Sequence, residues 1–527
     1  MTAETPTISG HRALQAEQPL IFEQGAPDKT AVDLPPPGAY VERLGGCRRR
    51  AAAGLPGLAE PEVVRHYLRL SQKNFSIDGG FYPLGSCTMK HNPRLNEKVA
   101  RLQGIGDLHP LQPQSTVQGA LAIIDACAKW LKALTGLPAV AMSPGAGAHG
   151  ELTGLMTIRA ALEARGDARR RVLVPESAHG TNPASAHFCG YGVEAIPANE
   201  RGRVDLGAVR DKLGPDVAAI MLTNPNTCGL FENDILKIAE AVHDAGAFFY
   251  CDGANFNAIV GRVRPGDLGI DCMHINLHKT FSTPHGGGGP GSGPVVLSAA
   301  LAPYAPLPYL IHDSDGRLRL VEASGEGEAK PFGRIKGFHG QFGMFVRALA
   351  YMMSMGGDGL RQASGDAVLN ANYLLARLTG TLHPAFDGPC MHEVLFDEQT
   401  LKGTGVTTLD LAKALIDEGF HPMTIYFPLV VHGAMLVEPT ETESKATLDS
   451  FIRSVQGLVA RAKTGDARFF EDAPRLAPRR RLDETRAARR PVLRWQPSAV
   501  EEAGERAPEP EAATATRSKT ASGQAAE

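Results

Sequence analysis

The chain has 527 residues, which is too long for a single hydrophobic core and predicts two or three domains. Its formal charge is -3 and 21% of its residues are charged. The sequence therefore has neither the basic excess typical of nucleic-acid binding nor the acidic excess of a solvating segment. A small molecule or another protein is the expected partner.

The cysteines and the hydropathy pattern suggest a cellular location. Eight cysteines are scattered without a Cys-x-x-Cys pair or the Cys/His spacing of a zinc site, so we expect reduced thiols and no metal. The first residues lack a basic start followed by an apolar stretch, and no run of eighteen apolar residues occurs. These features predict a soluble cytoplasmic protein that binds neither nucleic acid nor membranes.

The pattern along the chain predicts four regions. Residues 1–95 read as an N-terminal arm, because the first 75 or so are rich in Pro, Gly and polar residues. In 96–345, helix-like and strand-like segments alternate, which predicts a large α/β domain with a mainly parallel sheet. A long helix beginning near Phe342 and a mixed region after it predict a smaller α+β domain, 346–497. Residues 498–527 have almost no large apolar residue and are expected to be disordered.

A glycine-rich segment in the large domain is suited to an anion. Gly145–Gly150 matches G-x-G-x-x-G, follows an expected strand at 139–142 and precedes an expected helix at 151–164. Exposed backbone N–H groups and the helix dipole at such a turn attract phosphate. The candidate contacts are Gly147, Ala148 and His149. A dinucleotide-binding fold is the competing hypothesis, although Glu176 comes later than its ribose-binding acid should.

An acid follows one of the most apolar segments. Asp252 comes directly after the run 247–251, which is typical of a strand buried on both faces. The carboxyl ends of strands in open α/β sheets are where ligands bind. A carboxylate there could keep a pyridine nitrogen protonated and so strengthen the ring as an electron sink. Taken alone, Asp252 could equally cap a turn with Gly253.

Two other polar residues follow strand-like runs. His179 follows 172–174, and its imidazole could stack on an aromatic ring or serve only as a structural hydrogen-bonding group. Asn224 follows 217–222 and could hydrogen-bond a phenolic oxygen, with a simple Asx-Pro turn as the competing account.

Lys279 stands between a strand-like run, 273–277, and the glycine-rich turn 286–289. A lysine amine is a nucleophile only without its proton, and a half-buried site beside a cofactor's positive groups favours the neutral amine. This position indicates a lysine that forms a Schiff base, most often with pyridoxal phosphate, although a surface lysine in a glycine loop is the ordinary alternative. His278 could face a phosphate or cap the strand, and Thr280 is a further candidate contact.

These positions follow one another as phosphate loop, stacking residue, polar contact, pyridine acid and lysine, each after a strand. One crevice could collect all five. The combination favours pyridoxal phosphate over a nicotinamide cofactor, which has no use for Asp252 and Lys279 together.

Longer segments carry a family resemblance that extends from about Leu70 to Trp495. The most specific are 71–76 (SQKNFS), 82–90 (YPLGSCTMK), the segments around Gly145, His179 and Lys279, and 438–444 (EPTETES). In these segments the chain resembles the glycine-cleavage P-protein, the pyridoxal-phosphate-dependent glycine decarboxylase. It is most similar to the lysine-bearing second subunit of the two-subunit bacterial form.

The resemblance implies a fold-type I, aspartate aminotransferase-like architecture, with Lys279 as the Schiff-base residue. His179, from its position after a strand, is the second candidate catalytic residue. It implies decarboxylation of glycine and transfer of the aminomethyl group to the lipoyl arm of the H-protein. It also implies a companion subunit 1 without the lysine, two copies of each chain forming a heterotetramer. Another fold-type I amino-acid decarboxylase or aminotransferase is the alternative, whereas a non-catalytic binding subunit would not need Lys279. Segment 82–90 could close over a substrate or contact another subunit.

Overall fold

The computed structural model describes residues 18–495 except 27–28, 31–34, 36–37, 39–40, 42, 48, 51–52, 110, 287–290 and 326–328. The chain consists of two compact units, Met1–Arg480 and Arg481–Glu527. The described part of the second unit contains helix α13 (Glu484–Arg489). The expected disorder of 498–527 and most of the glycine-rich turn after Lys279 lie outside the described residues.

A seven-stranded sheet forms the centre of the first unit, in the order β1-β7-β6-β5-β4-β2-β3. Strand β7 is antiparallel to both its neighbours, and the other four pairings are parallel. The mainly parallel sheet predicted from the sequence is therefore confirmed. The strands are β1 (Ala139–Ala141), β2 (Arg171–Pro175), β3 (Gly192–Ile196), β4 (Val217–Thr223), β5 (Phe248–Gly253), β6 (Cys272–Ile275) and β7 (Val295–Leu297).

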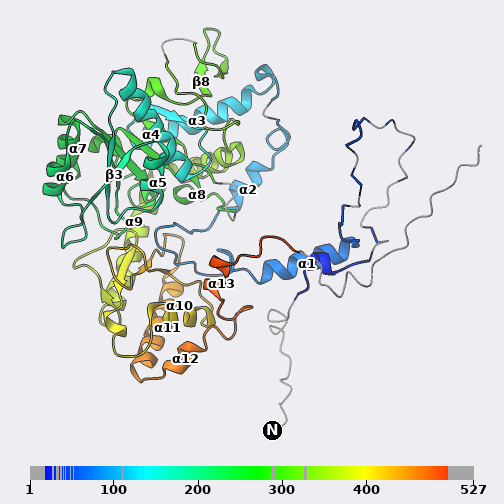
Figure 1. The fold of residues 1–527 in the computed structure, drawn as a ribbon, viewed down its shortest axis with the longest axis vertical. Helices are drawn as coiled ribbons and strands as arrows, with labels where there is room; N and C mark the ends of the chain where they lie inside the picture. The colour runs from blue at the N-terminus through cyan, green and yellow to red at the C-terminus, as the bar shows by residue number, and fades with distance from the viewer. Residues whose placement is uncertain are drawn as a thin grey trace, which may run out of the picture. The chain divides into compact units, whose positions relative to one another are not determined.

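Both faces of this sheet are buried, which explains the continuous apolar runs of its central strands. Along β5, Phe249 belongs to one apolar cluster, whereas Phe248 and Tyr250 belong to another. The first cluster also takes in the apolar face of α7, and the second takes in that of α4. The helices around the sheet, cyan to green in Figure 1, are α3 (Gln118–Thr135), α4 (Gly147–Ala164), α5 (Thr181–Phe188), α6 (Leu206–Lys212), α7 (Ile235–Asp244) and α8 (Leu277–Thr280).

A 37-residue helical segment, α9 (Phe342–Leu378), begins where the sequence predicted and contains a break at Gly356, with φ 63° and ψ -178°. After it comes a four-stranded antiparallel sheet in the order β10-β11-β13-β12. Its apolar core is separate from those of the large sheet. This α+β region consists of β10 (His383–Pro384), β11 (Val394–Asp397), β12 (Thr424–Ile425), β13 (Met435–Val437), α10 (Thr408–Asp417), α11 (Lys445–Lys463) and α12 (Ala467–Glu471). The domain boundaries proposed from the sequence stay a prediction.

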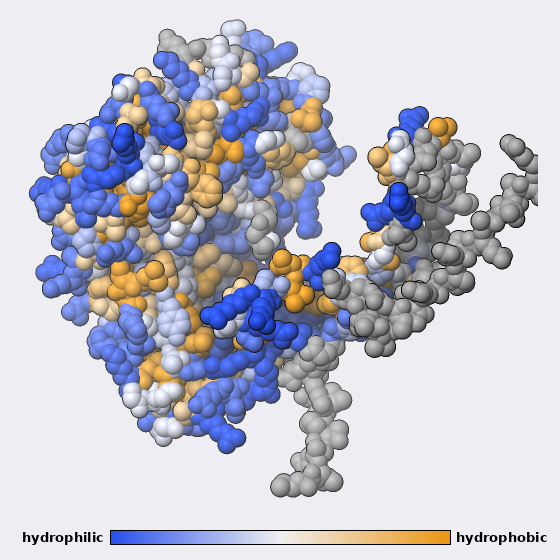
Figure 2. Space-filling model, viewed as in Figure 1, coloured by the Kyte–Doolittle hydropathy of each residue, from blue (hydrophilic) through white to orange (hydrophobic). Residues whose placement is uncertain are grey.

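A hairpin and two helices complete the described strands and α-helices. A hairpin joins β8 (Tyr309–His312) and β9 (Leu318–Val321), and α1 (Glu60–Gln72) and α2 (Arg94–Ala100) flank the segment 81–90. Figure 2 shows a visible surface that is mostly hydrophilic, with apolar residues in scattered patches. Among the described residues, no helix has the length and apolar character needed to cross a bilayer.

Candidate active site

A pocket lies at the carboxyl ends of the parallel strands, where open α/β sheets bind ligands. Its walls come from the segments after β1, β2, β4, β5 and β6, together with one residue from the N-terminal region. The lining residues are Ser86, Gly147, Ala148, Glu151, His179, Thr181, Thr223, Thr227, Asp252, Ala254, Asn255, His274, Asn276, His278 and Lys279.

Lys279 lies in the single helical turn α8 that follows β6. The expected strand ends at Ile275, because the carbonyl of Asn276 accepts the backbone N–H groups of Lys279 and Thr280 at 3.1 and 3.2 Å. The lysine side chain is buried, and its Nζ donates to the carbonyl oxygen of Ser86 at 3.1 Å. An amine that lines a pocket with so little solvent around it is well placed to act as a nucleophile.

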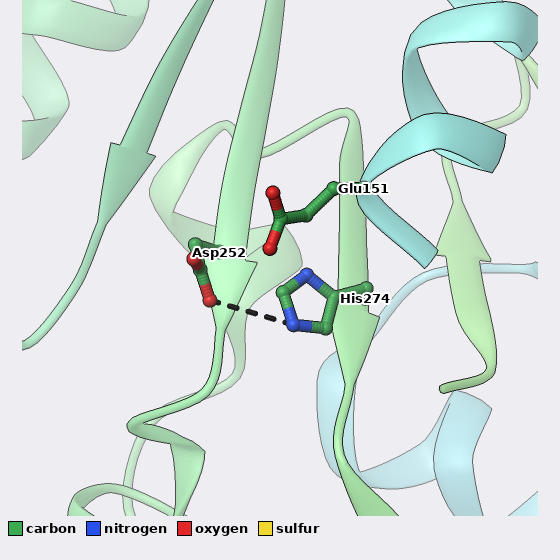
Figure 3. A group of neighbouring side chains, drawn as sticks. All are labelled: Glu151, Asp252 and His274. Carbon is green, nitrogen blue, oxygen red and sulfur yellow. Dashed lines mark ion pairs between the residues drawn. The ribbon is translucent and has the colours of Figure 1, made fainter. Parts of the chain in front are cut away.

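Asp252, His274 and Glu151 meet on one side of this pocket, from β5, β6 and α4 (Figure 3). His274 Nε2 lies 3.4 Å from Asp252 Oδ1, and its Nδ1 lies 2.6 Å from the hydroxyl of Tyr250. The backbone N–H of Ala254 donates to the same Asp252 oxygen at 2.9 Å. These contacts fix the carboxylate at the strand end with one face toward the pocket.

The protonation of Glu151 sets the net charge beside Asp252. Burial, and then the neighbouring Asp252 carboxylate, raise the pKa of Glu151 to about 8, so that it holds a proton at neutral pH. Thr181 donates to one Glu151 oxygen at 2.8 Å, and the amide nitrogen of Asn182 lies 2.8 Å from the other oxygen and 3.2 Å from Asp252 Oδ2. The two acids therefore bring one negative charge to this side of the pocket.

The histidines of the pocket are neutral. Burial lowers the pKa of His179 and of His274, and burial with the nearby His285 and Lys279 lowers that of His278 to about 3. His179 Nδ1 lies 3.0 Å from the hydroxyl of Thr181. A neutral imidazole presents a flat face without adding positive charge, which suits it to stacking on a ring.

Another part of the pocket wall is the N-terminus of α4, an 18-residue helix that begins at Gly147. A Cβ on Gly147 would lie 2.5 Å from Asn276 Nδ2, so only glycine leaves room for this close approach. His278 also lines the pocket, with its Nδ1 accepting the backbone N–H of Ser292 at 3.2 Å. The helix terminus supplies N–H donors and a positive dipole end, as a phosphate requires.

Three of the residues predicted from the sequence do not line the pocket. His149 is bound to backbone on both sides, since Nδ1 accepts from Gly145 and Nε2 lies 3.2 Å from the carbonyl of Ile335. The Asn224 side-chain oxygen accepts the backbone N–H of Glu232, eight residues along the chain, at 3.1 Å, which is not the local bond of an Asx-Pro turn. Thr280 is fully buried behind Lys279.

Several lining residues were not predicted. Glu151 lies one helical turn after Gly147, and His274 in β6 stands two residues before Asn276, whose side-chain oxygen lies 3.0 Å from its Nε2, so periodicity could have found both. Thr223 is the last residue of β4, and its buried hydroxyl has no partner among the described residues. Ser86 was included only in the segment 82–90, which could close over a substrate, because its contact with Lys279 spans 193 residues and leaves no local pattern.

Comparison with known proteins agrees with this geometry. The family described as glycine dehydrogenase, C-terminal domain, matches residues 363–472, and the aminotransferase class-V family matches 152–288. The chain is 66% identical over 498 residues, 94% of its length and 95% of the relative's, to a probable glycine dehydrogenase (decarboxylating) subunit 2 of Caulobacter vibrioides. A protein of the same description from Kosmotoga olearia is 49% identical, covering 90% of this chain and 99% of that one.

Solved structures share the fold at low identity. A glycine decarboxylase (P-protein) of the glycine cleavage system, in inhibitor-bound form, superimposes with a TM-score of 0.64 at 22% identity, covering 81% of this chain and 91% of that one. The glutamate decarboxylase of Lactobacillus brevis gives 0.60 at 14% identity, covering 82% and 95%. The architecture is thus that of the fold-type I pyridoxal phosphate enzymes, and the dinucleotide-binding alternative is set aside. By sequence, the chain belongs to the family of glycine dehydrogenase (decarboxylating) subunit 2.

Proposed function

We propose that this chain uses pyridoxal phosphate to decarboxylate glycine and passes the remaining aminomethyl group to the lipoyl arm of the glycine-cleavage H-protein. The observation that carries the proposal is that Lys279 and Asp252 line one pocket, in a chain closely related to proteins described as glycine dehydrogenase subunit 2.

The donor set of the pocket fits the cofactor. The N-terminus of α4 at Gly147 and Ala148 would receive the phosphate, and His278 lines the same pocket. Asp252 would pair with the pyridine nitrogen, and the unpartnered hydroxyl of Thr223 offers a donor to a ring oxygen. His179 would lie against the ring face. Lys279 would hold the cofactor covalently.

The cofactor, when bound, supplies an electron sink for the pair of electrons that carbon dioxide leaves behind. The protein's own groups would support this in three ways. Asp252 would hold a proton on the pyridine nitrogen. Lys279 would hold the cofactor through its amine and would release it when the substrate amine takes its place. The protonated Glu151 prevents a second buried charge from competing with Asp252.

The partners belong to the same proposal. The related proteins are described as subunit 2, which implies a companion subunit 1. We propose a heterotetramer with two copies of each chain, to which the lipoylated H-protein docks. A cytoplasmic location agrees with the eight cysteines, all of which are free thiols in the structure.

The test is exchange of labelled bicarbonate into the carboxyl group of glycine. The chain is assayed with lipoylated H-protein, with and without the companion subunit, and each component is omitted in turn. Exchange that requires both chains supports the proposal. A normal cofactor spectrum without exchange in the complete assembly would move the function to another amino acid, as in other fold-type I decarboxylases and aminotransferases.

A further inference from the structure

A second group of buried acids lies beside Lys279, outside the pocket lining. Glu393, just before β11, and Glu438, just after β13, are both fully buried. With the adjacent His392 they each place a ligand-type atom within 4.8 Å of the others. One oxygen of each carboxyl group has no hydrogen-bond partner in the described structure. Burying two carboxyl groups this close together costs free energy, so we expect them to have a structural or functional role that offsets this cost.

Both acids bind the same short segment of the N-terminal region. The backbone N–H of Ser86 donates to Glu393 Oε2 at 2.7 Å, and the hydroxyl of Thr88 donates to Glu438 Oε1 at 2.5 Å. Ser86 has a φ of 63°, a left-handed conformation that a serine adopts only at a cost. The bond to Glu393 offsets that cost and fixes the direction of the Ser86 peptide.

The segment Leu84–Thr88 also packs against the small sheet, the four-stranded sheet β10-β11-β13-β12. Leu84 forms a β-bridge with Val437, and Thr424 donates to the carbonyl of Gly85 at 2.7 Å. A Cβ on Gly85 would lie 2.4 Å from the side chain of Leu436, so the segment has no room to move toward the sheet. The Ser86 carbonyl of this segment accepts a hydrogen bond from the Lys279 amine.

The charges favour one proton on the pair. Burial raises the pKa of Glu438 to about 7, and burial with the neighbouring Glu438 raises that of Glu393 well above its usual value. The cation facing both acids is Lys279, while Lys90 and Glu441 face Glu438. His392 adds no charge, because burial and Lys279 lower its pKa to about 3. A single proton leaves one negative charge beside the lysine.

We propose that Glu393 and Glu438 share one proton. Through Ser86 and Thr88, the two acids fix the segment Leu84–Thr88, and its Ser86 carbonyl binds the Lys279 amine when that amine is not bonded to the cofactor. They are positioning residues rather than catalytic ones. This role rests on the proposed function only in taking Lys279 as the cofactor lysine. It also gives segment 82–90 a place within its own chain, between the small sheet and α8.

The test for positioning measures how fast the apoprotein forms its lysine-linked absorbance band with added pyridoxal phosphate. In Glu393→Gln the amide oxygen still accepts from Ser86 and the amide nitrogen replaces the shared proton, so the rate should stay within about twofold. In Glu393→Met, of similar length but without an acceptor, the rate should fall by about tenfold, as expected for a lost buried hydrogen bond. Equal rates for the Met and Gln variants would overturn the positioning role.

Two further variants keep the proposal testable if Glu393→Met does not fold. Thr88→Val keeps the shape of the side chain, removes the donor to Glu438 and should slow linkage by about fivefold. Glu393→Gln/Glu438→Gln keeps both acceptors but cannot titrate. The wild-type melting temperature should fall as pH rises from about 4.5 to about 7, and the double variant should lose that part of the fall. The shared proton would be overturned if the melting temperature of the double variant depended on pH as that of the wild type does. It would also be overturned if the wild type bound one equivalent of metal that Glu438→Gln released.

These readouts use no glycine. If the complete wild-type assembly forms the lysine-linked absorbance band but exchanges no bicarbonate into glycine, the proposed substrate is rejected and the positioning role stands. If the rate at which that band forms does not depend on Glu393, the positioning role is rejected whatever the substrate.

Discussion

Lys90 and Glu441 form a buried ion pair, with 2.6 Å between Nζ and Oε1 and side-chain exposures of 1% and 9%. Burial alone would lower the pKa of Lys90, but the Glu441 carboxylate raises it. The same ammonium donates to the carbonyl of Thr280 at 2.9 Å and to Asn257 at 2.8 Å. The pair therefore connects the N-terminal segment, the residue after Lys279 and the loop that follows β13.

Replacing Lys90 with Met should destabilise the protein by about 3–5 kcal/mol, because Glu441 would be left buried without its cation. The measurement is denaturant-induced unfolding of the apoprotein. Lys445→Ala is the matched control, since Lys445 and Asp449 form an exposed i,i+4 pair at 2.6 Å and its loss should change the free energy of unfolding far less. Equal effects of the two substitutions would show that burial does not decide the strength of the Lys90 pair.

Asp252→Asn should reduce bicarbonate exchange by about 100-fold or more while the lysine-linked absorbance still forms. The amide keeps the shape and can still accept from Ala254, but it removes the negative charge proposed to hold the ring nitrogen protonated. Asp234→Asn, an exposed acid paired with Lys237, is the control and should leave exchange unchanged. Full exchange by Asp252→Asn would rule out its proposed role.

Glu151 predicts a specific pH dependence of stability. Its pKa is raised from 4.5 to about 8 in the folded protein, so the folded state holds this proton more tightly than the unfolded state. Its contribution to stability is fully present below about pH 4.5 and is lost as pH rises toward 8. Glu151→Gln cannot lose a proton, and relative to wild type its free energy of unfolding should improve by about 2–4 kcal/mol between pH 5 and pH 8. Parallel stability profiles would contradict the raised pKa.

The close approach at the phosphate end can be tested with two Gly→Ala substitutions. Gly147→Ala should weaken pyridoxal phosphate binding by about tenfold or more, because its methyl group would collide with Asn276 Nδ2 at 2.5 Å. Gly119→Ala in α3 meets no atom within 4 Å and should stabilise the helix by up to about 1 kcal/mol without changing cofactor binding. Unaltered affinity in Gly147→Ala would move the phosphate away from this helix terminus.

Much of the site could be read from local patterns, because parallel strands bring their carboxyl ends to one edge. Asp252, His179 and Lys279 each follow an apolar strand, and each lines the same pocket. The pattern did not reveal that β7 inserts antiparallel between β1 and β6, or that β3 contributes no residue to the pocket. Such choices depend on how distant strands pair rather than on composition.

The sequence could not show side-chain partners that lie far along the chain or in the backbone. His149 and Asn224 occupy plausible ligand positions, yet backbone groups bind both ring nitrogens of His149 and the side-chain oxygen of Asn224, whereas the Asn224 side-chain nitrogen has no partner among the described residues. The contact between Ser86 and Glu393 spans 307 residues and leaves no periodic signal. Burial decides the protonation of acids such as Glu151, and burial is a property of the whole fold.

The most direct test of the account is to reduce the cofactor-loaded protein with borohydride and map the labelled peptide by mass spectrometry. The account predicts that pyridoxal phosphate is fixed on Lys279, and that Lys279→Ala folds normally but traps none. Label on another lysine, such as Lys336 near Gly145, or a normal lysine-linked spectrum in Lys279→Ala, would contradict it.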